Sequence, residues 1–214
     1  CPIGFRGPGF SFSDLLLRIL MRRGYQYDAS TFPTYLGPLA RMYYFMSTRL
    51  TAEQRAERKQ LFGKFREGFR PLKPFTWSCT EGQLTEIPVT TMPIFKVPIH
   101  ASYILYLAQF SSTVAMAYWR MALLLCRTMG VGPSLLLHPL DFMGCDDDRD
   151  LAFFPAMGRP AEPKIEIVSR MIDMMTHHYD VRPMREHAAA IRERSSASSR
   201  IKVIDEFCST VSGK

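Results

Sequence analysis

The sequence feature that most constrains the fold is a short apolar run, Ser134–Leu137, enclosed by prolines. Gly132-Pro133 precedes the run, and Pro139 follows it after one residue. An apolar run of this length between chain breakers is typical of a strand buried on both faces. Because Pro139 cannot continue a sheet ladder, we expect the strand to end on His138. In α/β folds this edge of the sheet carries active sites, so His138 is a candidate catalytic residue; a histidine that merely caps a strand fits the pattern equally well.

The N-terminal part predicts one unit of an alternating α/β fold. Ile3–Phe5 is a short apolar stretch, and Ser13 is placed as the N-cap of an apolar helix that stops at Gly24. Tyr25–Asp28 then predicts a second strand. Strand, helix and strand in so few residues indicate an α/β architecture.

Further elements follow along the chain. Apolar residues at helical spacing predict helices over 102–110, over 112–129 and from Pro163. Short apolar stretches marked by proline predict strands at Leu84–Thr90, Ile94–Ile99 and Val181–Met184. From residue 188 the chain is polar and rich in serine, so residues 188–214 are expected to form a mobile tail after a domain spanning 1–187.

Positive charge is concentrated in one segment. Residues 41–77 hold nine basic and three acidic residues, nearly all of the formal net charge of +7. Thr51 and Gln54 form a capping box for a basic, partly aromatic helix, so residues 31–80 are predicted to be a largely helical insertion. Such a helix can rest on an anionic membrane surface or pack its apolar stripe on the domain and leave its charges in water. Nucleic-acid binding is not expected, since no known binding module accompanies the charge.

Composition excludes several classes of protein. With 47% apolar and 22% charged residues in 214, the chain is an ordinary globular sequence. No apolar run approaches the roughly 18–20 residues of a membrane span. The five cysteines include no Cys-x-x-Cys pair, which favours a reducing compartment. We therefore expect a cytoplasmic protein, either free or peripheral at the inner membrane surface.

Three stretches resemble, in this order, parts of the NodB-type polysaccharide deacetylases (carbohydrate esterase family 4). Gly4–Phe10 is similar to the family's Arg-x-Pro loop, Gly24–Ser30 to the strand after the next helix, and Leu135–His138 to its late Leu-x-His strand. Tyr179–Glu186 is similar to the way such domains end. The resemblance covers residues 5–187, with 31–80 as an insertion. It implies a partial distorted (β/α) barrel of the polysaccharide deacetylase type, namely its C-terminal portion.

The resemblance also implies an activity. Family members are metal-dependent hydrolases that remove an N-acyl group, acetyl or formyl, from an amino sugar of a polysaccharide or a lipid-linked glycan. On this basis His138 would be the general acid that protonates the departing amine, and Arg6 would orient the base carboxylate. Pro8 and Phe10 would wall the sugar site. Asp28, or alternatively Asp141, would be the acid that tunes the imidazole, and Asp141 is also a candidate substrate-binding residue.

The metal-binding part of the family pattern is missing. The early Asp-Asp pair and the His-x-x-x-His motif do not occur in this sequence. We therefore expect ligands for a divalent metal, with zinc the expected ion, upstream of Cys1, and we expect this chain alone to be inactive. The alternative is a non-catalytic, carbohydrate-binding relative that assists polysaccharide assembly or export.

Overall fold

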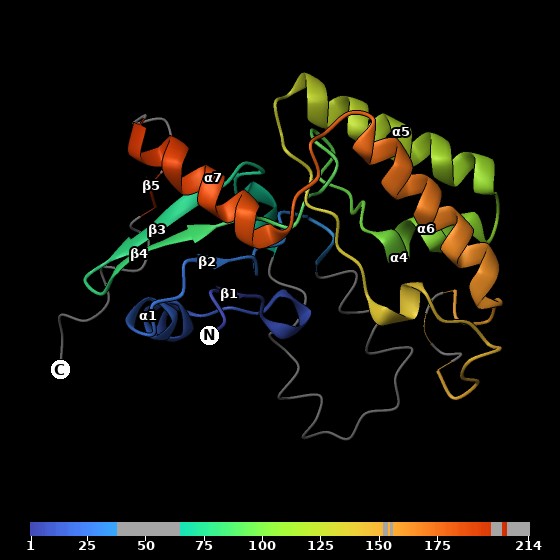
Figure 1. Ribbon diagram of the computed structural model, residues 1–214, viewed down its shortest axis with the longest axis horizontal. Helices are drawn as coiled ribbons and strands as arrows, with labels where there is room; N and C mark the ends of the chain where they lie inside the picture. Colours follow the sequence, from blue (N-terminus) through green and yellow to red (C-terminus); the bar gives the residue numbers. More distant parts are fainter. Residues whose placement is uncertain (38–64, 152–153, 155, 198–202, 205–214) are drawn as a thin grey trace. The chain divides into compact units, whose positions relative to one another are not determined.

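The computed structural model describes residues 1–37, 65–151, 154, 156–197 and 203–204. The chain divides into two compact units. Unit 1 comprises Cys1–Val89 and Arg182–Lys214, and unit 2 comprises Thr90–Val181. Figure 1 shows the helices and strands of both units.

Unit 1 is built on a five-stranded, mostly parallel sheet in the order β1-β2-β4-β3-β5. Its strands are β1 (Gly4–Phe5), β2 (Tyr27–Asp28), β3 (Phe75–Cys79), β4 (Gly82–Glu86) and β5 (Val203–Ile204). Only the β3–β4 pair is antiparallel. Its helical elements are η1 (Pro8–Phe10), α1 (Asp14–Arg22), η3 (Phe65–Phe69) and α7 (Met184–Ala197). The predicted α/β class is confirmed.

The predicted strand–helix–strand unit at the N-terminus is confirmed. The Ser13 hydroxyl accepts a hydrogen bond from the amide of Leu16 at 3.3 Å and caps α1. Gly24 ends the turn after α1 at φ +73°, a left-handed conformation that glycine adopts without steric cost. Strand β2 returns parallel to β1, and a parallel return requires a crossover connection, which α1 provides.

The two faces of the sheet carry different helices. Leu17 and Leu20 of α1 pack with Phe75, Trp77 and Leu84 in one buried cluster. Helix α7 packs Ala188 and Ile191 against Ile87, with Tyr27 beside them. Figure 1 shows α1 and α7 on either side of the strands. This layered arrangement buries both faces of the short strands, as a parallel sheet requires.

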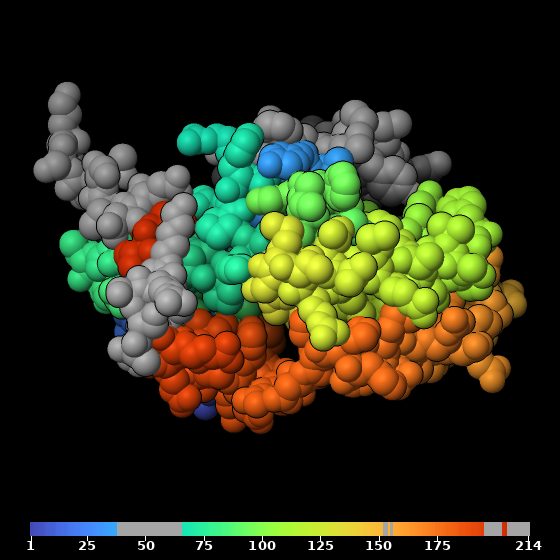
Figure 2. All heavy atoms as spheres, turned by 90° about the horizontal axis from the view of Figure 1, so that it is seen from above, coloured from blue at the N-terminus to red at the C-terminus, as the bar shows by residue number. Residues whose placement is uncertain are grey.

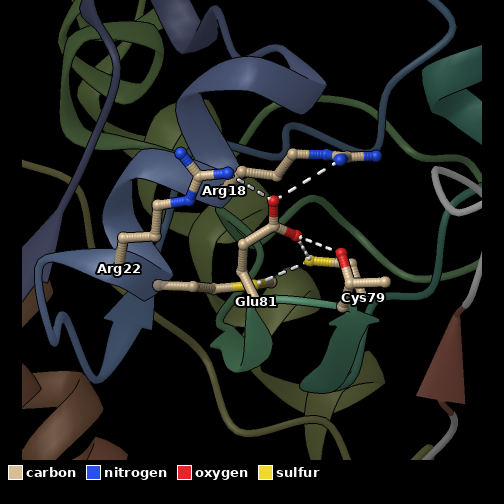
Figure 3. Close-up of polar contacts among 6 residues, drawn as sticks. Arg18, Arg22, Cys79 and Glu81 are labelled. Atoms are coloured by element: carbon tan, nitrogen blue, oxygen red, sulfur yellow. Dashed lines mark hydrogen bonds and ion pairs between the residues drawn. The ribbon is translucent and has the colours of Figure 1, made fainter. Parts of the chain in front are cut away.

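One glutamate ties α1 to the hairpin between β3 and β4. Glu81 accepts hydrogen bonds from Arg18 at 3.4 Å and Arg22 at 2.8 Å, both on α1 (Figure 3). Hydrogen bonds from Thr80 and Cys79, together with that from Arg22, lower the pKa of Glu81 to about 2. Because α1 precedes the hairpin by some sixty residues, these contacts fix a long-range packing at the sheet's end.

Unit 2 is helical in its described residues. It contains α4 (Ala101–Ala108), α5 (Ser112–Thr128), the short η4 (Pro139–Asp141) and α6 (Ala161–Thr176). Helix α5 packs against both α4 and α6. The buried indole of Trp119 on α5 donates to the carbonyl of Met171 on α6 at 3.0 Å. The three long helices that the apolar spacing predicts in this region are confirmed within one or two residues.

Several predicted elements are wrong. Residues 134–138 belong to no strand in the described part of the chain, and neither 94–99 nor 181–184 forms a strand there. A single bridge between Thr91 and Pro98 closes a turn instead. The prolines in these stretches remove ladder donors, which explains why apolar composition alone was misleading.

Two elements cross the bounds of the predicted insertion and tail. Strand β3 lies inside 31–80 and belongs to the central sheet, and α7 continues to Ala197 across the predicted boundary after residue 187. The predicted basic helix, over about 51–65, lies outside the described residues except at its end, as do 198–202 and 205–214. Within the described segments, none of the helices combines the length and apolarity needed to cross a membrane.

Candidate functional site

In unit 2, His138 stands at the start of a tight turn rather than at the end of a strand. Pro139 occupies the first position of η4, where its fixed φ suits the turn and its missing N–H is not needed. The amide of Asp141 donates to the carbonyl of His138 at 2.9 Å. In return the amide of His138 donates to Oδ2 of Asp141 at 2.7 Å. The sequence His-Pro-Leu-Asp therefore brings the imidazole and the carboxylate together locally.

Ser102, in the first turn of α4, completes a polar network with these two residues. Its hydroxyl donates to Oδ1 of Asp141 at 2.7 Å and lies 3.1 Å from Nδ1 of His138. Nδ1 itself lies 3.6 Å from Oδ2 of Asp141. The Asp141 residue is 3% exposed, whereas the imidazole is 46% exposed. Burial alone would raise the pKa of Asp141, but hydrogen bonds from His138 and Ser102 outweigh it and lower that pKa.

The hydrogen bonds assign the proton on the ring. The Ser102 hydroxyl gives its one proton to the ionised Asp141, so it can only accept from His138. Nδ1 must then carry a proton, which leaves Nε2 as the ring nitrogen that is not engaged in this network. Since its proton is committed to the carboxylate, Ser102 is not poised as a nucleophile with His138 as its base.

A buried lysine fixes the turn that carries Asp141. The Nζ of Lys164, on α6, donates to the carbonyl oxygens of Leu140, at 2.6 Å, and of Met143. Burial lowers the pKa of Lys164, partly offset by the charge of Asp141. These bonds satisfy two carbonyl groups that a short turn leaves without intrahelical donors.

Unit 1 holds a second cluster, at the carboxyl ends of its parallel strands. Asp28 ends β2, Glu86 ends β4, and the two are register partners on the same face of the sheet. Both are fully buried. The Glu86 carboxyl accepts from the amide and hydroxyl of Thr31, at 2.9 and 2.7 Å, and from the indole of Trp77 at 2.8 Å. The carboxylate of Asp28 accepts from Ser30 at 2.7 Å.

Two buried acids side by side cannot both be ionised without a large cost. Burial first, and then the charge of Asp28, raise the pKa of Glu86 to about 8. Burial also raises the pKa of Asp28, against hydrogen bonds from Ser30 and Glu86. With both groups ionised, Oδ2 of Asp28 is buried without a donor. A protonated Glu86 supplies that donor, so we assign one shared proton to the pair.

Arg6 follows β1 at the same edge of the sheet. Its Nε donates to the carbonyl of Ala29 at 3.0 Å. Burial lowers the pKa of Arg6, and the charge of nearby Asp28 opposes that shift. Phe10 lies four residues further on with φ +60° and stacks on Phe32, the ring centroids being 4.5 Å apart. The neighbouring Pro8 is exposed.

The predicted site residues thus fall into two groups. Arg6, Asp28, Pro8 and Phe10 belong to unit 1, whereas His138 and Asp141 belong to unit 2. Of the two acids considered as partner of the imidazole, Asp141 makes the contact, and Asp28 bonds to Ser30. As a direct substrate ligand Asp141 is poorly placed, because it is buried and both its oxygens accept hydrogen bonds within the chain.

Two residues of these clusters escaped sequence reasoning. Glu86 could have been noticed as a charge inside the mostly apolar stretch Leu84–Val89, within a predicted strand. Ser102 carries no such signal, because a serine near a helix start is first explained as a cap.

The expected metal has no place in the described residues. No group of three or more His, Cys, Asp or Glu side chains in this part of the chain could hold an ion. Ligands upstream of Cys1, where the resemblance places them, remain a prediction. Searches against known protein families, curated proteins and solved structures gave no match for this chain.

Proposed function

We propose that this chain contributes the proton-donating part of an amide hydrolase that acts on N-acylated amino sugars, in the manner of the polysaccharide deacetylases. The observation that carries the proposal is the network of Ser102, His138 and Asp141. It holds a half-exposed imidazole by its Nδ1 side and directs its acid–base chemistry to Nε2.

The chemistry explains why such a group is needed. When water adds to the amide carbon, a C–O bond forms, and the C–N bond then breaks with its electron pair going to nitrogen. An amine anion is a poor leaving group, so a proton must reach nitrogen as the bond breaks. In the proposal, that proton comes from Nε2 of the His138 imidazolium, which is stabilised by the buried carboxylate of Asp141.

One part of the fold, the N-terminal unit, supports the same family. The parallel β1–α1–β2 unit, with Arg6 directly after β1, agrees with the order of elements expected from the resemblance. A distorted (β/α) barrel of the deacetylase type is part of the proposal.

The experiment is acetate release from N-acetylglucosamine oligomers by the full-length protein. We expect His138→Ala to lower the rate by roughly 10²–10⁴, as is typical when a general acid is lost. His177→Ala is the matched control, because His177 also lies near a carboxylate, Asp173, at 3.8 Å but on the exposed end of α6. An unchanged rate in His138→Ala would remove this residue from the role. Oligomer binding without acetate release would favour the carbohydrate-binding alternative.

A further inference from the structure

Helix α5 is apolar on the face that it buries and also on the face that it exposes. Its inner face consists of buried residues that pack within unit 2: Ala115, Met116, Trp119, Ala122, Leu123 and Cys126. On the opposite side Val114, Met121 and Leu124 are 59%, 50% and 54% exposed. Ala117 is exposed between them. Figure 2 shows residues of α5, in lime, at the surface. A helix that is apolar on both faces normally has a partner on both.

The exposed residues have the spacing of a helix–helix seam. Val114, Ala117, Met121 and Leu124, here called the α5 seam, follow each other at intervals of three, four and three residues. This is the alternation of a and d positions in a heptad, which forms a narrow stripe along one side of a helix. The small Ala117 allows a second helix to approach closely. Helices that lie on a membrane usually have a wider apolar face, so the narrow seam favours a helical partner.

The charges beside the seam define the chemistry of that partner. Arg120 and Arg127 are exposed, lie seven residues apart and flank the seam on one edge. The sequence contains no Asp or Glu from Ile87 to Leu140. A second copy of α5 would bring the same arginines and no acidic residue. The segment 38–64 of this chain is also more basic than acidic. Charge complementarity therefore favours a partner helix with acidic flanks.

We propose that the α5 seam binds an amphipathic helix of another protein, with apolar residues at heptad spacing and acidic residues beside them. Apolar side chains of the partner would cover Val114, Met121 and Leu124, and its carboxylates would pair with Arg120 and Arg127. This proposal does not depend on the chemistry assigned to His138.

The test uses two synthetic 21-residue peptides with leucine at every a and d position. One carries Glu at its e and g positions and the other carries Lys. Their binding to the full chain is measured by fluorescence anisotropy at low salt. We expect the Glu peptide to bind at least about tenfold more tightly than the Lys peptide. We also expect the double variant Arg120→Glu/Arg127→Glu to reverse the preference.

Substitutions in the seam separate this contact from non-specific attraction. Leu124→Glu should weaken binding of the Glu peptide by about tenfold or more. The matched control is Ile165→Glu, at an apolar residue of α6 that is 42% exposed, and it should leave binding unchanged. Circular dichroism verifies that each variant remains folded, which is expected because every substituted side chain is largely exposed.

Four outcomes would overturn the proposal. The first two are equal binding of the two peptides and binding of neither. The third is a concentration-dependent dimer of the chain alone that Leu124→Glu dissociates. The fourth is binding to phosphatidylserine vesicles that Leu124→Glu abolishes, while neither peptide binds. The dimer would assign the seam to a second copy, and the vesicle result to a membrane surface.

Discussion

Glu86→Gln should change how the stability of unit 1 depends on pH. The wild-type side chain must be protonated beside Asp28 in the folded state, with a pKa of about 8 against 4.5 when unfolded. Because the pKa is raised in the folded state, the stabilisation that this proton contributes is fully present below about pH 4.5. It is lost progressively as the pH rises through about 8. For one proton, the free energy of unfolding falls by about 1.4 kcal/mol per pH unit within this range. The expected loss between pH 6 and pH 8 is about 2 kcal/mol, since the slope diminishes near the folded pKa.

Glutamine removes this titration and keeps most of the local hydrogen bonds. Its amide oxygen can still accept from Thr31, and its amide group can donate to Asp28. The Trp77 indole, however, loses its acceptor, at a cost of about 1–3 kcal/mol. The slope of the free energy of unfolding against pH is therefore a sharper readout than the stability at any single pH.

Urea unfolding followed by tryptophan fluorescence measures this slope. Trp77 bonds to Glu86, and Trp119 is the second of two tryptophans, so both proteins are prepared with Trp119→Phe. His187 titrates in the same pH range, because burial lowers its pKa from 6.5, but its contribution is common to both proteins. Equal slopes for wild type and Glu86→Gln between pH 6 and pH 8 would refute the shared proton.

Three further substitutions test other contacts. Glu81→Gln should lower the melting temperature at pH 7 and have little effect near pH 2. The pKa of Glu81 is depressed, so the stabilisation from its charge is present above about pH 4.5 and is lost as the pH falls through about 2. A constant effect of the substitution across this range would contradict the role of the charge. Lys164→Met should destabilise unit 2 by about 1–3 kcal/mol for each carbonyl left without a donor, and an unchanged urea midpoint would show that water replaces the ammonium group. Ser102→Ala should lower acetate release by the full-length protein less than His138→Ala does, since it removes a positioning contact and leaves the imidazole; an effect as large as that of His138→Ala would give the hydroxyl a direct role in the chemistry.

Local patterns were sufficient to predict the elements whose signals are local. Ser13 and Gly24 bound α1, and apolar spacing located α4, α5 and α6. Strands were less predictable, because pairing depends on partners distant in sequence. The stretch before His138 has strand composition, yet its amide at Ser134 bonds to the hydroxyl of Thr90 and not to a neighbouring strand.

The candidate site shows the same limit. His138 and Asp141 are three residues apart, so a proline turn between them is enough to join them. Ser102 joins them through packing of α4, and Glu86 meets Asp28 only through the register of β2 and β4. Neither contact leaves a periodic pattern in the sequence, so only the folded chain reveals it.

The protonation pattern of His138 tests the proposed catalytic role most directly, through long-range ¹⁵N–¹H NMR of histidine-labelled protein. At a pH where the ring is neutral, the hydrogen bonds described above predict a proton on Nδ1 and a bare Nε2, and they predict that Ser102→Ala weakens this preference. A neutral ring that carries its proton on Nε2 in the wild-type protein would contradict the hydrogen bond from Nδ1 to Ser102, and with it the network on which the proposed role rests.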